Sequence, residues 1–346
     1  MEGGRKEFCK LGNELKLRGI VKLGKQGKVL GVLVMATMVV SILGGCGSSK
    51  SSDPAAPKKV KIAVVLKAIN SDYWKQVKAG AVDAGKSLNV EVQVVGPNAE
   101  TDIAGQASMM EDQIVKGVSA LVVAPSQPSA ALSSFDKADA DKIPVILIDT
   151  DAKWDKKKSF VGTGNEAGGK VGGDYIAKSL KTSDDIVMIR GALGDATHDE
   201  RIKGATDALT AGGFKVSAVQ PADSDRNKAM SVMENLLQTH PNVKAVFCSN
   251  DEMALGAVRA LKAANKTNVI IVGFDGSPDA LNSIIAKELT ASVAQSAYNI
   301  GKAGVEAGVK VAKGEKIDAR IDTGTNLITK DNAQKAKDDL AKILAR

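Results

Sequence analysis

The stretch 244–276 restricts the folds open to this chain, because it contains a complete strand–helix–strand unit. A short apolar run, Lys244–Cys248, is followed by polar residues, a segment with helical spacing and a second apolar run, Val269–Val272. Asn250 follows the first run and Asp275 follows the second. In open parallel sheets the carboxyl ends of strands lie beside helix N-termini and form ligand sites. We therefore expect Asn250 and Asp275 to face one ligand together.

The same alternation of apolar runs and helical spacing extends over most of the chain. The other apolar runs are Val60–Leu66, Val90–Val95, Ala120–Ala124, Val145–Ile148, Ser159–Val161, Ile186–Ile189, Lys215–Val219 and Thr290–Val293. Helical spacing occurs, for example, in Tyr73–Leu88, Gln106–Val115, Gly168–Leu180, Arg201–Ala211, Lys228–Thr239 and Glu252–Ala264. This order is typical of an α/β protein with parallel sheets. About ten strands are too many for one small sheet, so we predict two similar doubly wound parallel-sheet lobes.

The chain is basic, but the excess charge lies in its first residues. The formal net charge of the whole chain is +7. Residues 1–45 contain eight Lys and Arg residues against three Glu residues, so the remainder carries only about +2. No dense basic run with interleaved aromatic residues occurs, which argues against nucleic-acid binding.

Residues 1–45 have the pattern of a secretory signal peptide: a basic segment, the apolar run Val29–Ile42 and small residues before Cys46. A membrane-spanning anchor is the alternative, but the apolar run is short for one. Leu43–Cys46 resembles the bacterial lipobox, which implies cleavage before Cys46 and diacylglycerol on its thiol. The long basic segment also allows a translation start downstream of Met1. Residues 46–59, rich in Ser, Pro and Lys, are expected to be a flexible tether outside the cytoplasm.

Cysteine and histidine are too scarce to suggest a disulfide or a metal centre. With Cys9 in the leader and Cys46 lipidated, only Cys248 remains, and it ends an apolar run as a buried residue would. His198 and His240 are the only histidines. We therefore expect no metal and no cofactor.

Polar and aromatic side chains follow the expected strands. Hydroxyl groups of a ligand can donate to carboxylates and accept from amides and cations, and an aromatic ring can cover the C–H face of a sugar ring. This set therefore suits a polyhydroxylated ligand. The candidate ligand-binding residues are Lys67, Ser71, Tyr73, Trp74, Asp149, Thr150, Arg201, Ser224, Asn250, Asp275 and Gln295.

Several of these residues also have simpler structural interpretations. Asp275 could shape a turn, and Asn250 could cap the following helix. Arg201 could be a solvated residue in a first helical turn. Tyr73 and Trp74 could pack into the core of their own lobe.

From Val60 to about Asp322 the chain resembles the periplasmic sugar-binding proteins of ABC transporters, most closely the ribose- and allose-binding type. The strings that carry the resemblance are Gln220–Asp223, Asn250–Gly256, Val272–Gly276 and Gly172–Ala177. The resemblance implies two lobes joined by three crossovers, with the ligand clamped between them. It divides the chain into an N-terminal lobe, 60–163 plus 296–321, and a C-terminal lobe, 164–295 plus 322–346. The hinge residues would be Gly162, Gly164, Gln295 and Asp322.

The resemblance also implies residue roles. Asp149, Arg201, Asn250, Asp275 and Gln295 would bind hydroxyl groups, and Tyr73 and Trp74 fall where the family stacks aromatic rings on the sugar.

Departures from the ribose pattern concern specificity. Lys67 matches the allose type, Ser71 stands where Asn is common, and Thr150 replaces an Arg. Ser224 stands where the family has an aromatic residue, so one wall of the stack is missing. This favours a larger or different ligand than ribose, such as a hexose, a cyclitol or a sugar-derived signal.

The function these observations favour is a lipid-anchored solute-binding protein, monomeric, that delivers a sugar or polyol to an ABC permease. A sensory subunit for a membrane receptor is an alternative with the same fold. An enzyme using a dinucleotide is a weaker one, because the glycines Gly162, Gly164 and Gly168 lack the spacing of the fingerprint and no strong strand precedes them. The tail, Lys330–Arg346, is expected to form an amphipathic helix that packs on a lobe.

Overall fold

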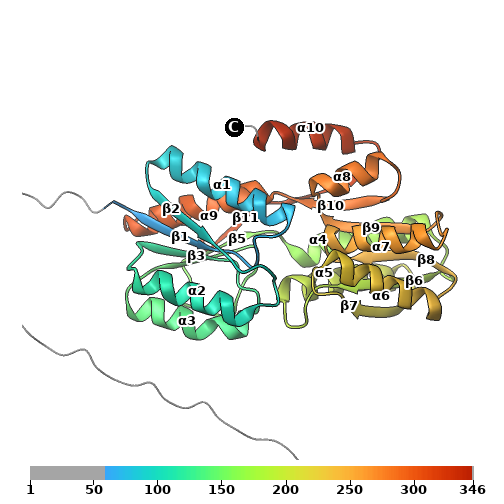
Figure 1. Ribbon diagram of the computed structural model, residues 1–346, viewed down its shortest axis with the longest axis horizontal. Coiled ribbons are helices and arrows are strands. Elements are labelled where there is room, and N and C mark those ends of the chain that lie inside the picture. The colour runs from blue at the N-terminus through green and yellow to red at the C-terminus, as the bar shows by residue number, and fades with distance from the viewer. Residues whose placement is uncertain (1–58, 345–346) are drawn as a thin grey trace, which may run out of the picture. The chain divides into compact units, whose positions relative to one another are not determined.

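The computed structural model describes residues 59–344, which form two six-stranded sheets flanked by helices (Figure 1). The leader, Cys46 and most of the tether lie outside the described residues. Within residues 59–344, no helix is long and apolar enough to cross a membrane.

The first sheet has the strand order β11-β5-β4-β3-β1-β2, and all its pairs are parallel. Its strands are β1 (Lys61–Val65), β2 (Glu91–Val95), β3 (Ala120–Val123), β4 (Val145–Ile148), β5 (Ser159–Gly162) and β11 (Arg320–Asp322). Most of these residues are buried, as expected for parallel strands covered on both faces.

The second sheet repeats this topology with the order β12-β10-β9-β8-β6-β7. Its strands are β6 (Asp185–Arg190), β7 (Val216–Pro221), β8 (Val243–Cys248), β9 (Ile270–Asp275), β10 (Ala291–Gln295) and β12 (Thr325–Thr329). Only β12 is antiparallel to its neighbour. The strand order reverses between β1 and β3 in one sheet and between β6 and β8 in the other, and such switch points are where doubly wound sheets bind ligands.

Helices cover both faces of each sheet, as the predicted doubly wound fold requires. In the first lobe α1 (Asp72–Leu88) and α9 (Ala297–Ala312) pack on one face, and α2 (Ile103–Val115) and α3 (Pro128–Ala140) pack on the other. In the second lobe α4 (Asn165–Ser179) and α5 (Ala196–Ala211) cover one face. The opposite face is covered by α6 (Arg226–Thr239), α7 (Asp251–Ala263), α8 (Pro278–Ile285) and α10 (Ala333–Leu344).

The chain passes between the sheets three times: after β5, after β10 and after β11. One consequence is that α9, from the C-terminal part of the chain, lies beside α1 in the first lobe (Figure 1). The approach is close, because a Cβ on Gly80 of α1 would lie 1.9 Å from the carbonyl oxygen of Tyr298.

The structure confirms the predicted fold class and adds two strands. β11 and β12 have few apolar residues and were not expected. The tail helix α10 lies beside α8 (Figure 1), and Ala333, Ala336 and Leu340 contact the core of the second lobe. Cys248 is buried, and burial raises the pKa of its thiol.

Candidate functional site

The polar residues at the carboxyl ends of the two sheets meet in one buried cleft between the lobes. Lys67 and Asp149 follow β1 and β4 of the first sheet, and Asn250 follows β8 of the second. Asp275 and Gln295 are the last residues of β9 and β10. Ten residues from both lobes line an inner cavity with Asp275: Lys67, Tyr73, Trp74, Glu100, Asp149, Thr197, His198, Arg201, Asn250 and Gln295.

Lys67 crosses the cleft and joins the lobes directly. Its Nζ donates to Asp195 Oδ2 at 2.6 Å and lies 3.4 Å from Asp149 Oδ2, and only 2 % of its side chain is exposed. Burial acts to lower the pKa of Lys67, but the negative charges of Asp195, Asp149 and Glu100 outweigh it and raise the pKa above 10.5. Lys67 is therefore a fixed cation.

Asp149 is held by hydroxyl groups of its own lobe. Its backbone has a φ of 62°, in the left-handed region that Asp tolerates. Tyr73 donates its phenolic hydrogen to Asp149 Oδ1 at 2.5 Å, and Thr150 donates to Oδ2 at 2.9 Å. Burial, followed by the charges of Asp149 and Asp275, raises the pKa of Tyr73 well above 10, so the phenol stays protonated. Thr150 also reaches across the cleft and hydrogen-bonds Thr197.

Arg201 and Asp275 form the centre of the second lobe's wall. Arg201 is 2 % exposed, so the solvated interpretation is wrong. Its Nε donates to Asn165 Oδ1 and its Nη1 to the carbonyl of Ser249, both at 2.9 Å, and its guanidinium lies 3.8 Å from the centre of the Phe274 ring.

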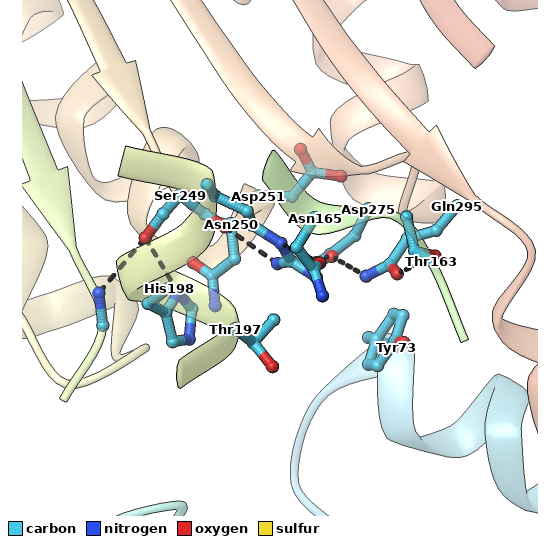
Figure 2. Close-up of polar contacts among 12 residues, drawn as sticks. Tyr73, Thr163, Asn165, Thr197, His198, Ser249, Asn250, Asp251, Asp275 and Gln295 are labelled. Atoms are coloured by element: carbon cyan, nitrogen blue, oxygen red, sulfur yellow. Dashed lines mark hydrogen bonds and ion pairs between the residues drawn. The ribbon is translucent and has the colours of Figure 1, made fainter. Parts of the chain in front are cut away.

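Asp275 accepts hydrogen bonds from two side chains of its own lobe, Arg201 and Gln295 (Figure 2 shows the Gln295 contact). Arg201 Nη1 is 3.4 Å from Asp275 Oδ1, and Gln295 Nε2 donates to the same oxygen at 2.7 Å. Gln295 in turn accepts from the Thr163 hydroxyl at 2.7 Å. Burial raises the pKa of Asp275 well above 3.8, although Arg201 opposes the shift. Asp275 also has a φ of 119° at the end of β9, and its side chain lines the inner cavity.

Asn250 combines the two roles that the sequence left open. Its Oδ1 accepts from the Met253 backbone N–H at 3.0 Å and so caps α7. Its side chain also lines the inner cavity and is only 6 % exposed. Among the described residues, neither Asn250 Nδ2 nor Arg201 Nη2 has a hydrogen-bond partner, so both can donate to a ligand.

The remaining candidates from the first lobe occupy the cleft rim and the core. Tyr73 and Trp74 belong to the lobe's core, and their rings meet edge to face at 4.9 Å. Both rings also line the inner cavity, and Trp74 Nε1 donates to Glu100 Oε1 at 2.7 Å. Ser71 is the N-cap of α1 and does not line the inner cavity. It lines a second cavity, farther out.

Ser224 reaches the cleft through a histidine. Its Oγ lies 2.9 Å from His198 Nε2, and the other ring nitrogen of His198, Nδ1, lies 2.8 Å from Ser249 Oγ (Figure 2 shows the His198–Ser249 contact). His198 is 3 % exposed and faces Glu100 of the first lobe, with Nε2 and Oε2 at 3.8 Å.

Two adjoining cavities remain between these side chains. The inner one has a volume of about 20 Å³. The outer one has about 70 Å³ and shares Tyr73, Glu100, Asn250 and Asp275 with it. Lys67 and Thr150 bridge the two lobes across this space through their contacts with Asp195 and Thr197. Binding therefore requires the lobes, and contacts such as Lys67–Asp195, to separate first.

One group of side chains in the cleft has the arrangement of metal ligands. Glu100, Asp195 and His198 present ligand atoms within 4.8 Å of one another. The Lys67 ammonium already contacts Asp195, and its positive charge opposes a cation at this position. We assign no metal to the group.

The predicted hinge residues lie at the crossings between the sheets. Gly162 ends β5 and Gly164 precedes α4, while Gln295 ends β10 and Asp322 ends β11. Gly162 is tightly packed, because a Cβ there would lie 2.6 Å from the Phe160 ring, whereas Gly164 has room for one.

Six polar residues of the cleft were not among the sequence candidates: Glu100, Thr163, Asn165, Asp195, Thr197 and His198. Glu100 and Asp195 precede helices, where carboxylates usually act as caps. The sequence pattern alone therefore did not distinguish them from ordinary helix caps. One signal could have identified His198: it lies in the first turn of the helix that follows a strand end, on the face that packs against the protein.

The fold and cleft define a two-lobed ligand-binding protein, and comparison with known proteins agrees. The family model described as "Periplasmic binding protein domain" matches residues 62–316. The chain belongs to this family.

Its relatives include proteins named for sugars. The ribose import binding protein of Escherichia coli strain K12 is 36% identical over 296 residues, which cover 86% of this chain and 98% of the relative. The D-allose-binding periplasmic protein of the same strain is 36% identical over 267 residues, covering 74% and 85%. A carbohydrate transporter solute-binding protein from Agrobacterium radiobacter, solved with D-arabinose, is 32% identical with a TM-score of 0.78 and covers 82% of this chain and 99% of that one.

Proposed function

We propose that this protein is an extracytoplasmic solute-binding protein that captures a monosaccharide or related polyol between its lobes and delivers it to an ABC permease. The relative named as a ribose import binding protein supports the transport role, and both it and the D-allose-binding periplasmic protein are named as binding proteins rather than enzymes. A structural neighbour from Bacillus halodurans with bound myo-inositol, 26% identical with a TM-score of 0.75, covers 81% of this chain and 98% of that one and supports the wider polyol class.

The observation that carries the proposal is the pairing of buried donors and acceptors across the cleft. Asp149 and Lys67 come from one lobe, and Arg201, Asn250 and Asp275 come from the other. Each hydroxyl of a polyol both donates and accepts a hydrogen bond, so such a mixed lining can satisfy several hydroxyls at once. Side chains from both lobes would then hold the closed state, and ligand would shift the open–closed equilibrium.

The lobes in this proposal are residues 60–163 plus 296–321 and residues 164–295 plus 322–346. Motion would occur at the three crossings, near Gly162, Gly164, Gln295 and Asp322. Opening would break the cross-cleft contacts of Lys67 and Thr150 and admit the ligand.

The proposal is tested by isothermal titration calorimetry of the purified protein against pentoses, hexoses and cyclitols. We expect at least one of them to bind with a 1:1 stoichiometry. Failure of every sugar and cyclitol to bind would contradict the proposed function.

The proposed location is the outer side of a membrane, with a diacylglycerol on Cys46 and the protein acting as a monomer. Labelled fatty acid should be incorporated in cells, and Cys46→Ser should abolish the label and release the protein. Cys9→Ser is the matched control and should keep both label and membrane association. Persistence of the label in Cys46→Ser would refute the anchor without affecting the binding proposal.

A further inference from the structure

Ser224 leaves a polar opening at one end of the cleft. It lies three residues beyond β7, with a φ of 58°, and its small side chain lines the outer cavity of about 70 Å³. Here the neighbouring buried group is the imidazole of His198. The wall is therefore made of hydrogen-bonding groups instead of a hydrocarbon surface.

His198 is held rigidly by contacts at both ring nitrogens. Ser249 Oγ accepts from the Gly191 backbone N–H at 3.2 Å and lies 2.8 Å from Nδ1, so its own hydrogen is available to that nitrogen. With Nδ1 accepting, Nε2 carries a hydrogen and donates it to Ser224 Oγ at 2.9 Å. Ser224 has no other hydrogen-bond partner among the described residues, so its hydroxyl hydrogen is free to point into the cavity.

Glu100 supplies an acceptor from the opposite lobe. Its Oε1 accepts from Trp74 Nε1, which fixes the carboxylate, and its Oε2 lies 3.8 Å from His198 Nε2, too far for a hydrogen bond. Burial alone would raise the pKa of Glu100, but interactions with His198, Lys67 and Trp74 lower it to about 2. Glu100 is therefore ionised at neutral pH and can accept a hydrogen bond from a ligand.

We propose that Glu100 and Ser224 form an outer subsite, oriented by His198, that binds the hydroxyl of an exocyclic hydroxymethyl group on the ligand. The ligand oxygen would accept from the Ser224 hydroxyl and donate to Glu100 Oε2. Both residues line the outer cavity, which adjoins the inner cavity at Tyr73, Asn250 and Asp275. The protein would thus select hexopyranoses over pentopyranoses, which lack this group. This inference rests on the proposed function and names its substrate class.

The test compares matched sugars that differ only in the hydroxymethyl group: D-allose with D-ribose, D-glucose with D-xylose, and D-galactose with L-arabinose. Calorimetry should show at least one hexose binding about tenfold or more tightly than its pentose, because only the hexose adds a hydroxyl that accepts from Ser224 and donates to the charged Glu100. A pentose that binds as tightly as its hexose in every pair, or binding of cyclitols alone, would overturn the subsite and leave the proposed function standing. Binding of no ligand at all would contradict the function itself.

Two variants locate the effect. Glu100→Gln keeps an acceptor for Trp74 but replaces the Oε2 acceptor with a donor, and Ser224→Ala removes the hydroxyl. Each should reduce hexose affinity about tenfold while changing pentose affinity less than threefold. Glu111→Gln, on the exposed face of α2, is the control and should change neither. Equal losses for both sugars of a pair would show that Glu100 and Ser224 only support the closed state, and would refute the subsite.

Discussion

Lys67 and Asp195 form an ion pair of 2.6 Å that links the two lobes, and only 2 % of either side chain is exposed. Asp149 flanks the same ammonium at 3.4 Å. The pair shows that the sheets' carboxyl ends approach closely enough for side chains to meet without an intermediary.

Removing the Lys67 charge should destabilise the protein severely. In the closed form Lys67→Met leaves Asp195 and Asp149 buried without their cation, and breaking a buried pair costs up to about 3–5 kcal/mol, less whatever opening of the lobes recovers by hydrating Asp195. Urea denaturation should report this loss. Lys61→Met is the control, because Lys61 and Glu91 form a pair whose side chains are more than half exposed, and we expect a change below about 1 kcal/mol. Equal urea denaturation midpoints for Lys67→Met and Lys61→Met would contradict a stabilising role of the buried Lys67 ion pair.

Arg201→Ala and Asp275→Ala should each weaken ligand binding at least about tenfold. Each change leaves a buried partner or a ligand hydroxyl unsatisfied, at a cost of about 1–3 kcal/mol. Calorimetry with whichever sugar binds the native protein measures the effect, and circular dichroism checks that the variants fold. Arg259→Ala, on the exposed side of α7, should bind normally. Unchanged affinity in both cleft variants would remove these residues from the site.

The carboxyl of Asp251 should make stability depend on pH. Burial raises its pKa to about 7, against hydrogen bonds from Ser277 and Ser292 that favour the charged form. Because the folded protein holds this proton more tightly than the unfolded chain, the contribution is complete below about pH 4 and is lost as the pH rises through 7.

Urea unfolding at several pH values tests this dependence. The free energy of unfolding of the native protein should fall between pH 5 and 8, and Asp251→Asn should flatten the slope. Asp112→Asn, an exposed change on α2, should leave the slope as it is. A native curve that rises across this interval would show that the hydrogen bonds outweigh burial.

Gly169→Ala should reduce both stability and ligand affinity. A Cβ on Gly169 would lie 2.1 Å from the backbone carbonyl oxygen of Arg201, so α4 and α5 would have to move apart and take Arg201 with them. Overpacking of this kind costs about 1–3 kcal/mol. Gly164→Ala is the matched comparison, since a Cβ there meets no heavy atom closer than 3.8 Å. Thermal unfolding measures stability and calorimetry measures ligand affinity. Equal melting temperatures and equal affinities for Gly169→Ala and Gly164→Ala would contradict the prediction.

The sequence predicted the fold well because buried parallel strands leave apolar runs that are separated by helical spacing. β11 and β12 were missed because each is short and mixed in polarity. At the site, Asn250 and Asp275 were found because they directly follow strong strands.

Asp195 and Glu100 could not be found in the same way. Asp195 meets Lys67, and Glu100 meets His198, only when two segments far apart in the chain are brought together. A helix-capping position has the same sequence pattern whether or not its side chain also faces another lobe.

The position of α9 beside α1 bears on how the chain reaches its native state. Ile300, Val305 and Val309 fill the core beneath β1, β3 and β4, yet they are synthesised after the entire β6–β10 region of the second sheet. The first lobe therefore cannot complete its core while the later part of the chain is missing, and the usual order of N-terminal domain first cannot apply. Such a chain stays incompletely folded until its C-terminal portion emerges, which is the state that the proposed export across a membrane requires.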